Sequence, residues 1–332
     1  MPFAEEILRT RTEDSTENSM KPDAQTSSSS ERRGAFASLS VSAREVFVTD
    51  GTKHSIPLEE ILSGGVPKDG IPSINKPHFI PAREADAFLQ DDSPGLGLVY
   101  DEEARFYPYQ ILVWHEIVND IVAGDPLVIT YCPLCATGIV FDAQVSGERM
   151  EFGVSGKLWQ SNLLMYNRAS DSADESLWSQ VLGEAVVGRH TGTRLHLVPA
   201  DTVRYGEWRA AHPETVVLSR ETGVRKPYGS DPYGSYYTDD SVGFGAMFND
   251  DRLPPKAFVL GIERDGKFKA YHKEALPEGT TTDTFSGADI VIEKNSAGEV
   301  RFFAGKERAS VPAVGSFWFS WLAVHPKTEL WK

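Results

Sequence analysis

The two cysteines of the chain, Cys132 and Cys135, are the residues whose type and spacing best suit chemistry. They occur in the tetrapeptide Cys-Pro-Leu-Cys, directly after the apolar, β-branched run 127–131. That run predicts a strand that ends at the first cysteine. Two thiols at the end of a strand come close enough to form a disulfide or to bind one soft metal ion. The sequence leaves both chemistries open, beside the alternative of two small apolar side chains in a core.

His115 is the candidate that would complete a metal site with the two thiolates. Two thiolates and an imidazole suit copper or an open zinc centre. We expect segment 113–120 to be helical and to run beside the strand that bears the cysteines. At helical spacing Asn119 would support His115, and Glu116 with Asp120 would add hydrogen bonds that orient the site. The alternative for this histidine is a capping or core role with satisfied hydrogen bonds.

A second group of residues is expected around the thiols. Met165 could supply a weak thioether ligand, although a methionine in an apolar strand is more often part of a core. The glycine-bearing turn 153–158 is too short for a phosphate-binding loop and lacks the last glycine of a Gly-x-Ser-x-Gly elbow. It remains either an ordinary turn or part of a pocket. The polar residues predicted to line that pocket are Ser155, Lys157, Asn162 and Gln180.

The net charge of −15 at pH 7 argues against binding to nucleic acid, because phosphate surfaces attract clustered Lys and Arg. No apolar run approaches the roughly 20 residues that span a bilayer, so we predict no membrane span. No pattern indicates an organic cofactor, a small-molecule substrate or a redox partner. We expect a cytoplasmic protein; the alternative is export through a twin-arginine-like segment at Arg32 and Arg33.

The chain divides into a polar tail and a β-rich body. Residues 1–44 are rich in Ser, Thr and charged residues, which predicts a disordered tail. From Glu45 onward, β-branched and aromatic residues alternate with turn residues at short spacing, which is typical of many short strands. A second helix is predicted over 205–212, ending before Pro213. The expected fold class is α+β, mainly β.

Two pairs of segments indicate a degenerate internal repeat. Segment 96–112 aligns with 260–276, and segment 208–215 aligns with 321–328. The first pair is offset by 164 residues and the second by 113 residues. Order is preserved, so we predict two copies of one short-stranded unit. The difference between the offsets predicts an insertion of about 50 residues in the first copy.

We expect the N-terminal copy at residues 45–227, a connector loop at 228–255 and the shorter C-terminal copy at 256–332. At the first offset the cysteine positions fall on Ser296 and Glu299, so the second copy has no thiols. The candidate site therefore belongs to the first copy. Four residues recur at equivalent places and are interpreted as structural: Trp208, His212, Trp321 and His325.

A set of short segments also carries a family resemblance. The segments are Lys68–Pro72, His115–Asp120, Tyr131–Cys135, Gly153–Leu158, Ser176–Gln180, Phe317–Phe319 and His325–Pro326. Together they resemble the domain-of-unknown-function family 3179, from about residue 60 to the C-terminus. The family has no assigned activity, so the resemblance implies little about function. Ala136 stands where the family pattern commonly has Gly, and Asn167 where it commonly has Asp.

Three functional hypotheses follow from these residues. The leading one is a metal-binding protein, using copper or zinc for redox chemistry or metal handling at the cysteine pair and His115. The second is a thiol-disulfide oxidoreductase in which Cys132 attacks and Cys135 resolves. The third is a non-catalytic ligand-binding or scaffold module whose cysteines are only packed. The sequence does not decide whether the protein is an enzyme.

Overall fold

The computed structural model describes residues 44–246, 248–296 and 298–331. The described residues belong to one compact unit. The tail predicted over residues 1–44, apart from Arg44, and the twin-arginine-like segment lie outside the described residues. Among the described residues, no helix has the length and apolar character needed to cross a membrane.

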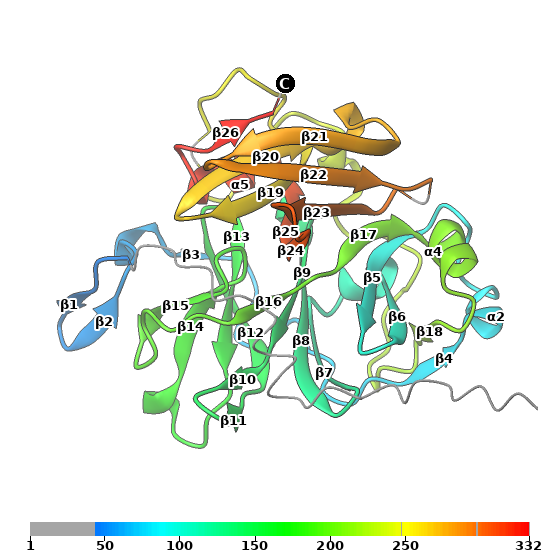
Figure 1. Cartoon of the computed structure of the whole chain (residues 1–332). Coiled ribbons are helices and arrows are strands. Elements are labelled where there is room, and N and C mark those ends of the chain that lie inside the picture. Colours follow the sequence, from blue (N-terminus) through cyan, green and yellow to red (C-terminus); the bar gives the residue numbers. More distant parts are fainter. Residues whose placement is uncertain (1–43, 247, 297, 332) are drawn as a thin grey trace, which may run out of the picture. The chain divides into compact units, whose positions relative to one another are not determined.

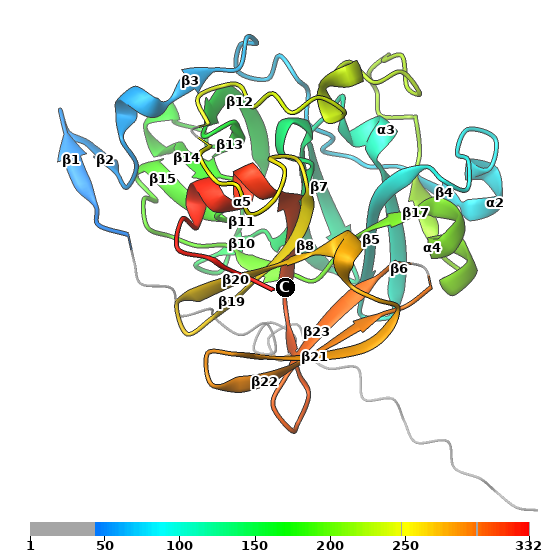
Figure 2. The same ribbon diagram turned by 90° about the horizontal axis from the view of Figure 1, so that it is seen from above.

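The prediction of many short strands with few helices is confirmed. The described residues form several small, mostly antiparallel sheets in a propeller-like arrangement (Figure 1). Figure 2 shows β12 to β15 and β21 to β23 on opposite sides of this unit. The helices are short: α2 (Ala82–Ala85), α3 (Tyr109–Leu112), α4 (Tyr205–Ala211) and α5 (Trp318–Val324). Single 3-10 turns are η1 (Leu58–Glu60), η2 (Pro133–Cys135), η3 (Ser172–Asp174), η4 (Gly234–Tyr237) and η5 (Lys273–Ala275).

Two sheets combine strands from the first half of the chain with later ones. The five-stranded sheet has the order β17 (Asp201–Arg204), β5 (Pro94–Tyr100), β6 (Glu103–Pro108), β18 (Val216–Leu218), β4 (Phe79–Pro81). The four-stranded sheet that carries the cysteines has the order β16 (His196–Val198), β9 (Thr137–Asp142), β8 (Asp125–Cys132), β7 (Ile117–Val122). Strands β7, β8 and β9 pair antiparallel, so the chain passes from one to the next through tight turns.

Residues 144–188 supply most of a third, seven-stranded sheet and a separate hairpin. The sheet order is β1 (Phe47–Thr49), β2 (Thr52–His54), β15 (Glu184–Gly188), β14 (Ser176–Ser179), β13 (Asn162–Asn167), β12 (Phe152–Trp159), β3 (Leu62–Ser63). The hairpin pairs β10 (Gln144–Val145) with β11 (Glu148–Arg149). One hydrophobic cluster joins this sheet to the cysteines, because it contains Phe152, Met165 and Trp178 together with both thiols.

The C-terminal part of the chain forms two further sheets. The first has the order β25 (Ala313–Phe317), β19 (Phe258–Arg264), β20 (Lys267–His272), β26 (Glu329–Leu330). The second has the order β21 (Gly279–Phe285), β22 (Ala288–Lys294), β23 (Val300–Ala304), β24 (Ala309–Val311). Phe317 and Phe319 of this part belong to the hydrophobic cluster that contains the cysteines.

Two glycines allow a tryptophan to lie flat on each of two sheets. A Cβ at Gly97 of β5 would lie 2.5 Å from the ring of Trp208, and one at Gly261 of β19 would lie 2.3 Å from the ring of Trp321. The indole nitrogen of Trp208 donates to Thr215 at 2.9 Å, and that of Trp321 donates to Thr328 at 2.9 Å. Glycine is required at both places because any side chain would overlap the indole.

Of the two predicted helices, one is confirmed and one is wrong. The helix expected over 205–212 is α4, and it ends directly before His212 and Pro213. Segment 113–120 is not a helix, because β7 begins at Ile117. Glu116 has φ 59°, a left-handed conformation that ends the short turn after α3. The i,i+4 relations inferred from helical spacing are therefore absent from this segment.

Candidate thiol site

The sharp turn between β8 and β9 brings the two cysteines together. Cys132 is the last residue of β8, and the 3-10 turn η2 begins at Pro133 and ends at Cys135. Proline suits the first position of such a turn because its φ is already fixed. Ala136 then takes φ 49°, a conformation that glycine adopts more easily. Strand β9 begins at the next residue, so both thiols lie on the short turn that joins β8 to β9.

Both thiols are free and buried, and they lie within hydrogen-bonding reach of each other. Cys132 is 2% exposed and Cys135 is 0% exposed. The carbonyl oxygen of Ser161 lies 3.4 Å from the sulfur of Cys135 and 3.8 Å from that of Cys132. Gln160 and Ser161 form the β12–β13 turn with φ 51° and 63°, and this backbone conformation aims that carbonyl at the sulfurs.

Asn162 and Gln180 hold Cys135 in a buried hydrogen-bond network. The amide of Asn162 donates to the sulfur of Cys135 at 3.6 Å and to the side-chain oxygen of Gln180 at 2.8 Å. Gln180 donates in turn to Thr130 of β8 and to the carbonyl of Thr137 of β9, each at 3.0 Å. Of these two residues, which the sequence singled out as pocket-lining, Asn162 contacts Cys135 and Gln180 contacts Asn162. Because every member is buried and paired, the network fixes the thiol geometry.

The two thiols have opposite pKa shifts. Burial raises the pKa of the Cys132 thiol well above its ordinary value, and the hydrogen bond with Cys135 raises it further. Burial also acts to raise the pKa of Cys135, but hydrogen bonds from Cys132, Ser320 and Asn162 outweigh it and lower that pKa. Cys135 is therefore the first thiol of the pair to ionise, and Cys132 donates its proton in a hydrogen bond to the thiolate.

Ser320 reaches the site from helix α5 in the C-terminal part of the chain. Its residue is 1% exposed, and among the described residues its hydroxyl has no hydrogen-bond partner at ordinary geometry. The same hydroxyl contributes to the lowered pKa of Cys135. A buried hydroxyl without another partner is available to donate to a thiolate. No pattern in the sequence connects this serine, 185 positions beyond Cys135, with the cysteine pair.

A small cavity of about 100 Å³ opens onto Cys132. Glu116, Lys157 and Tyr233 also line it. Burial, and then the nearby Cys132, raise the pKa of Glu116 well above its ordinary value. Burial also raises the pKa of Tyr233, and Glu116 and Cys132 add to that effect. The cavity therefore combines a sulfur with a carboxyl group that holds its proton more tightly than usual.

His115 was expected to join the cysteines, but its imidazole bonds to other residues. One ring nitrogen, Nδ1, bonds to the carbonyl of Pro72 at 2.7 Å, and the other, Nε2, bonds to the Tyr228 hydroxyl at 2.6 Å. Burial lowers the pKa of this histidine, so the neutral ring is favoured. Among the described residues, no three His, Cys, Asp or Glu side chains gather as metal ligands. In this structure His115 joins two loops and does not share a ligand cluster with the cysteines.

The remaining predicted residues are distributed around the site. The Asn119 side chain pairs with both the amide and the carbonyl of Phe152, each at 2.8 Å, and so fixes the start of β12. Asp120 faces elsewhere: it accepts from Arg105 at 2.7 Å and from Tyr107 at 2.8 Å.

Three predicted residues lie on β12 and β13. Ser155 donates to the carbonyl of Leu164 and accepts from the amide of Lys157 at 3.1 Å. Lys157 itself lines the cavity at Cys132. Met165 is fully buried in the hydrophobic cluster that contains the thiols, which is the core position considered from sequence.

The loop over residues 228–255 covers the cysteine turn with aromatic side chains. The Tyr236 hydroxyl donates to the carbonyl of Leu134, between the two cysteines, at 2.9 Å. The ammonium of Lys256 lies 3.6 Å from the centre of the Tyr236 ring. The carbonyl of Gly243 accepts from the Ser161 hydroxyl, and that of Phe244 accepts from the Ser161 amide at 3.1 Å. The loop therefore fixes both η2 and the carbonyl that faces the sulfurs.

These features define a β-rich protein of small sheets with a buried dithiol at the corner of two strands. Its sequence matches the family model described as protein of unknown function (DUF3179) over residues 68–309, and the chain belongs to this family. No curated protein and no solved structure matches the chain.

Proposed function

We propose that Cys132 and Cys135 form a redox-active dithiol that exchanges electrons with a small disulfide. The observation that carries the proposal is the pair of thiols with opposite pKa shifts beside a cavity. Cys135 has a lowered pKa, and Cys132 lines the cavity with Glu116. Two thiols that differ in pKa and in access to the cavity suit thiol-disulfide exchange, because one thiol must attack the oxidant and the other must then form the internal disulfide. The cavity of about 100 Å³ favours a small oxidant over a folded partner protein.

The exchange is balanced in two steps. In the first, the Cys132 proton passes to the Cys135 thiolate, and the Cys132 sulfur attacks the small disulfide. A mixed disulfide forms, and the departing thiolate takes a proton from Glu116. In the second step, the Cys135 sulfur attacks the Cys132 sulfur of the mixed disulfide, and the bond to the small thiol breaks. The Cys135 proton passes to this second small thiol, which leaves. The dithiol loses two electrons, the small disulfide gains them, and Glu116 is reprotonated from water.

The test is a redox titration of the full chain in buffers of reduced and oxidised 2-mercaptoethanol, whose disulfide is small. We expect the wild type to lose two hydrogens, about 2 Da, with one midpoint. The variants Cys132→Ser and Cys135→Ser cannot form the internal disulfide and serve as matched controls. A wild type whose thiols stay reduced and unreactive in oxidised 2-mercaptoethanol would overturn the redox proposal. Normal folding when both become Ala, together with no metal bound by the wild type, would then leave only the packed scaffold or ligand-binding module.

Soft-metal binding by the same two sulfurs is the second candidate. The donor set does not fit zinc, because His115 uses both ring nitrogens and, within the described residues, no third ligand joins the cysteines. It fits a soft monovalent ion such as Cu(I), which thiolates select, and Cys135 ionises readily. Such an ion would supply one-electron transfer or be handed to another protein. Elemental analysis after anaerobic supply of Cu(I) tests this, with Cys135→Ser as the metal-free control.

We also propose that the two halves derive from one repeated unit. Both have a sheet of the same order and pairing, β17-β5-β6-β18 and β25-β19-β20-β26, with the last pair parallel. At the offset of 164 residues, β22 overlaps the span of β8. The two units differ mainly in the length of one connection. In the longer unit, residues 143–195 connect β9 to β16, whereas in the shorter unit residues 305–308 connect β23 to β24. That extra segment supplies Asn162 and Gln180, which hold Cys135.

A further inference from the structure

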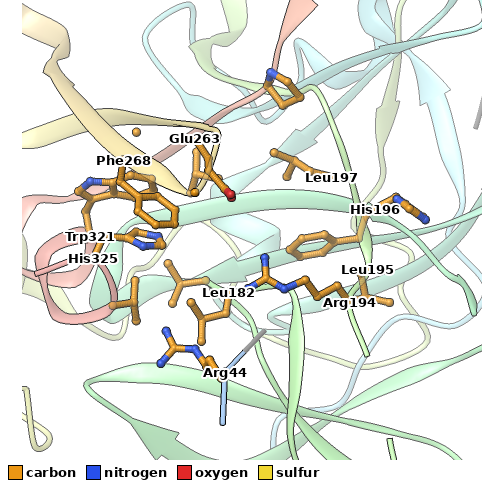
Figure 3. A pocket seen from close by; sticks show the side chains of 17 residues that line it. Arg44, Leu182, Arg194, Leu195, His196, Leu197, Glu263, Phe268, Trp321 and His325 are labelled. Atoms are coloured by element: carbon orange, nitrogen blue, oxygen red, sulfur yellow. The ribbon is translucent and has the colours of Figure 1, made fainter. Parts of the chain in front are cut away.

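A second cavity, of about 420 Å³, is lined in part by helix α5 (Figure 3). Its walls come from β19, β20, α5 and β16, together with the end of β9 and the start of the described chain. This volume is in the range of pockets that hold small molecules. The residues that determine its chemistry are Arg44, Arg194, Glu263, Phe268, Trp321 and His325.

One wall of this cavity is aromatic and apolar. The rings of Phe268 and His325 are stacked with their centres 3.7 Å apart, and the Trp321 ring lies 4.2 Å from His325. Burial, and then Arg44 and Arg194, lower the pKa of His325 to about 3. The imidazole is therefore neutral at physiological pH and acts as part of the aromatic wall. Leu182 and Leu197 add aliphatic surface near it (Figure 3).

Another wall carries an excess of positive charge. Arg194 forms an ion pair with the buried Glu184, with 2.9 Å between nitrogen and oxygen. Burial lowers the pKa of Arg44, Glu184 opposes that shift, and Arg194 adds to it. The carboxylate of Glu184 therefore pairs with Arg194 and acts electrostatically on Arg44. Guanidinium groups bind carboxylates in a planar, two-bonded geometry, so this wall is suited to an organic anion.

Glu263 contributes a hydrogen-bonding group without a partner. Its Oε1 atom is buried and, among the described residues, accepts no hydrogen bond. Figure 3 shows the carboxyl group directed into the cavity from β19. Burial raises the pKa of Glu263 to about 7, and Arg194 acts in the opposite direction. A buried acceptor that is left unpaired is costly, so a ligand that donates to it gains affinity.

We propose that this cavity binds an apolar carboxylic acid that also carries a hydrogen-bond donor. The carboxylate would pair with Arg44 and Arg194, the apolar body would lie on Phe268, Trp321 and His325, and the donor would bond to Glu263. Apolar α-hydroxy and α-amino acids have this arrangement. The proposal is independent of the redox chemistry of the cysteines.

The test is isothermal titration calorimetry on the full chain with a graded set of probes. L-phenyllactate and L-phenylalanine carry carboxylate, donor and ring, whereas 3-phenylpropionate lacks the donor and 3-phenylpropionamide also lacks the charge. We expect at least one of the first two to bind about tenfold more tightly than 3-phenylpropionate, and the amide not to bind. Tighter binding of L-phenyllactate would indicate a hydroxyl donor, and tighter binding of L-phenylalanine would indicate an ammonium donor.

Variants locate the binding. Arg44→Gln should weaken the better probe at least tenfold, and Glu263→Gln should reduce its advantage over 3-phenylpropionate. Arg308→Gln is the matched control, because that arginine pairs with Glu293 on another sheet. Binding that is equal for all four probes, unchanged in Arg44→Gln, or absent for every probe would overturn the proposal.

Discussion

At the scale of single residues, the thiol site depends on which groups donate to Cys135. Cys132 and Asn162 lie close to it in sequence or on the neighbouring hairpin, whereas Ser320 comes from α5. A hydrogen bond to a charged group contributes about 1.5–3 kcal/mol. Each donor therefore has a measurable effect on the first ionisation of the thiol pair.

The variant Ser320→Ala is expected to raise the pKa of that first ionisation by about one unit, because one donor to the thiolate is lost. The ultraviolet absorbance of the thiolate, followed against pH, measures it without assigning the proton to either sulfur. Ser310→Ala, on the exposed strand β24, is the control and should leave the curve unchanged. An unaltered curve in Ser320→Ala would mean that this hydroxyl does not bond to Cys135.

Glu263 gives a stability effect whose sign follows from its pKa. The folded-state value of about 7 exceeds the unfolded value of about 4.5, so folding favours the protonated carboxyl group. Stability from this group is complete below pH 4.5 and is lost as the pH rises to 7. Glu263→Gln removes the loss, so it should raise the melting temperature at pH 8 relative to wild type and have little effect at pH 4. An equal change at both pH values would contradict the raised pKa.

At the scale of elements, two of the sheets each place one tryptophan on one glycine. Methyl groups at Gly97 and Gly261 would lie within 2.5 Å of Trp208 and Trp321, respectively. Overpacking of this kind costs about 1–3 kcal/mol. Gly97→Ala and Gly261→Ala should therefore each lower the free energy of unfolding by a similar amount, measured by urea denaturation. Gly243→Ala is the control, because a Cβ there meets open space. Strongly unequal effects would argue against equivalent packing in the two halves.

The sequence predicted some elements and missed others for identifiable reasons. The strand before Cys132 and the helix before Pro213 follow from local patterns, an apolar β-branched run and a proline stop. The helix predicted over 113–120 is wrong because the apolar residues of this segment fit both a helix and a strand. The left-handed conformation of Glu116 excludes the helix, and no pattern in the sequence indicates that conformation. His115 was expected near the thiols on that wrong helix, and its real partner, Tyr228, is distant in sequence.

The sequence singled out Asn162 and Gln180 by their polar character as residues that line a pocket. In the structure both are buried; Asn162 donates to Cys135 and to Gln180, and neither residue lines the cavity at Cys132. The Ser161 carbonyl and the Ser320 hydroxyl could not be predicted, since the first is a backbone group set by a turn and the second depends on tertiary packing. Residue identity alone says nothing about either contact.

At the scale of the whole unit, the cysteine site requires the C-terminal part of the chain. Phe317 and Phe319 lie in the same hydrophobic cluster as Cys132, and both are buried. Ser320 follows them and reaches Cys135. The described residues form one compact unit, so the C-terminal part and the part that carries the cysteines need not fold separately.

A fragment of residues 36–255 is therefore expected to lose cooperative unfolding, because removal of the two phenylalanines alone exposes a core where each large-to-small change costs about 3–5 kcal/mol. The chain 36–332 is the matched control and should unfold in one transition that thermal circular dichroism and thiol alkylation report together. A fragment 36–255 that unfolds at the temperature of the control, with its thiols still protected, would contradict the shared core. Restoration of thiol protection by adding residues 256–332 as a separate chain would support it, since the cluster can then reassemble around Cys132 and Cys135.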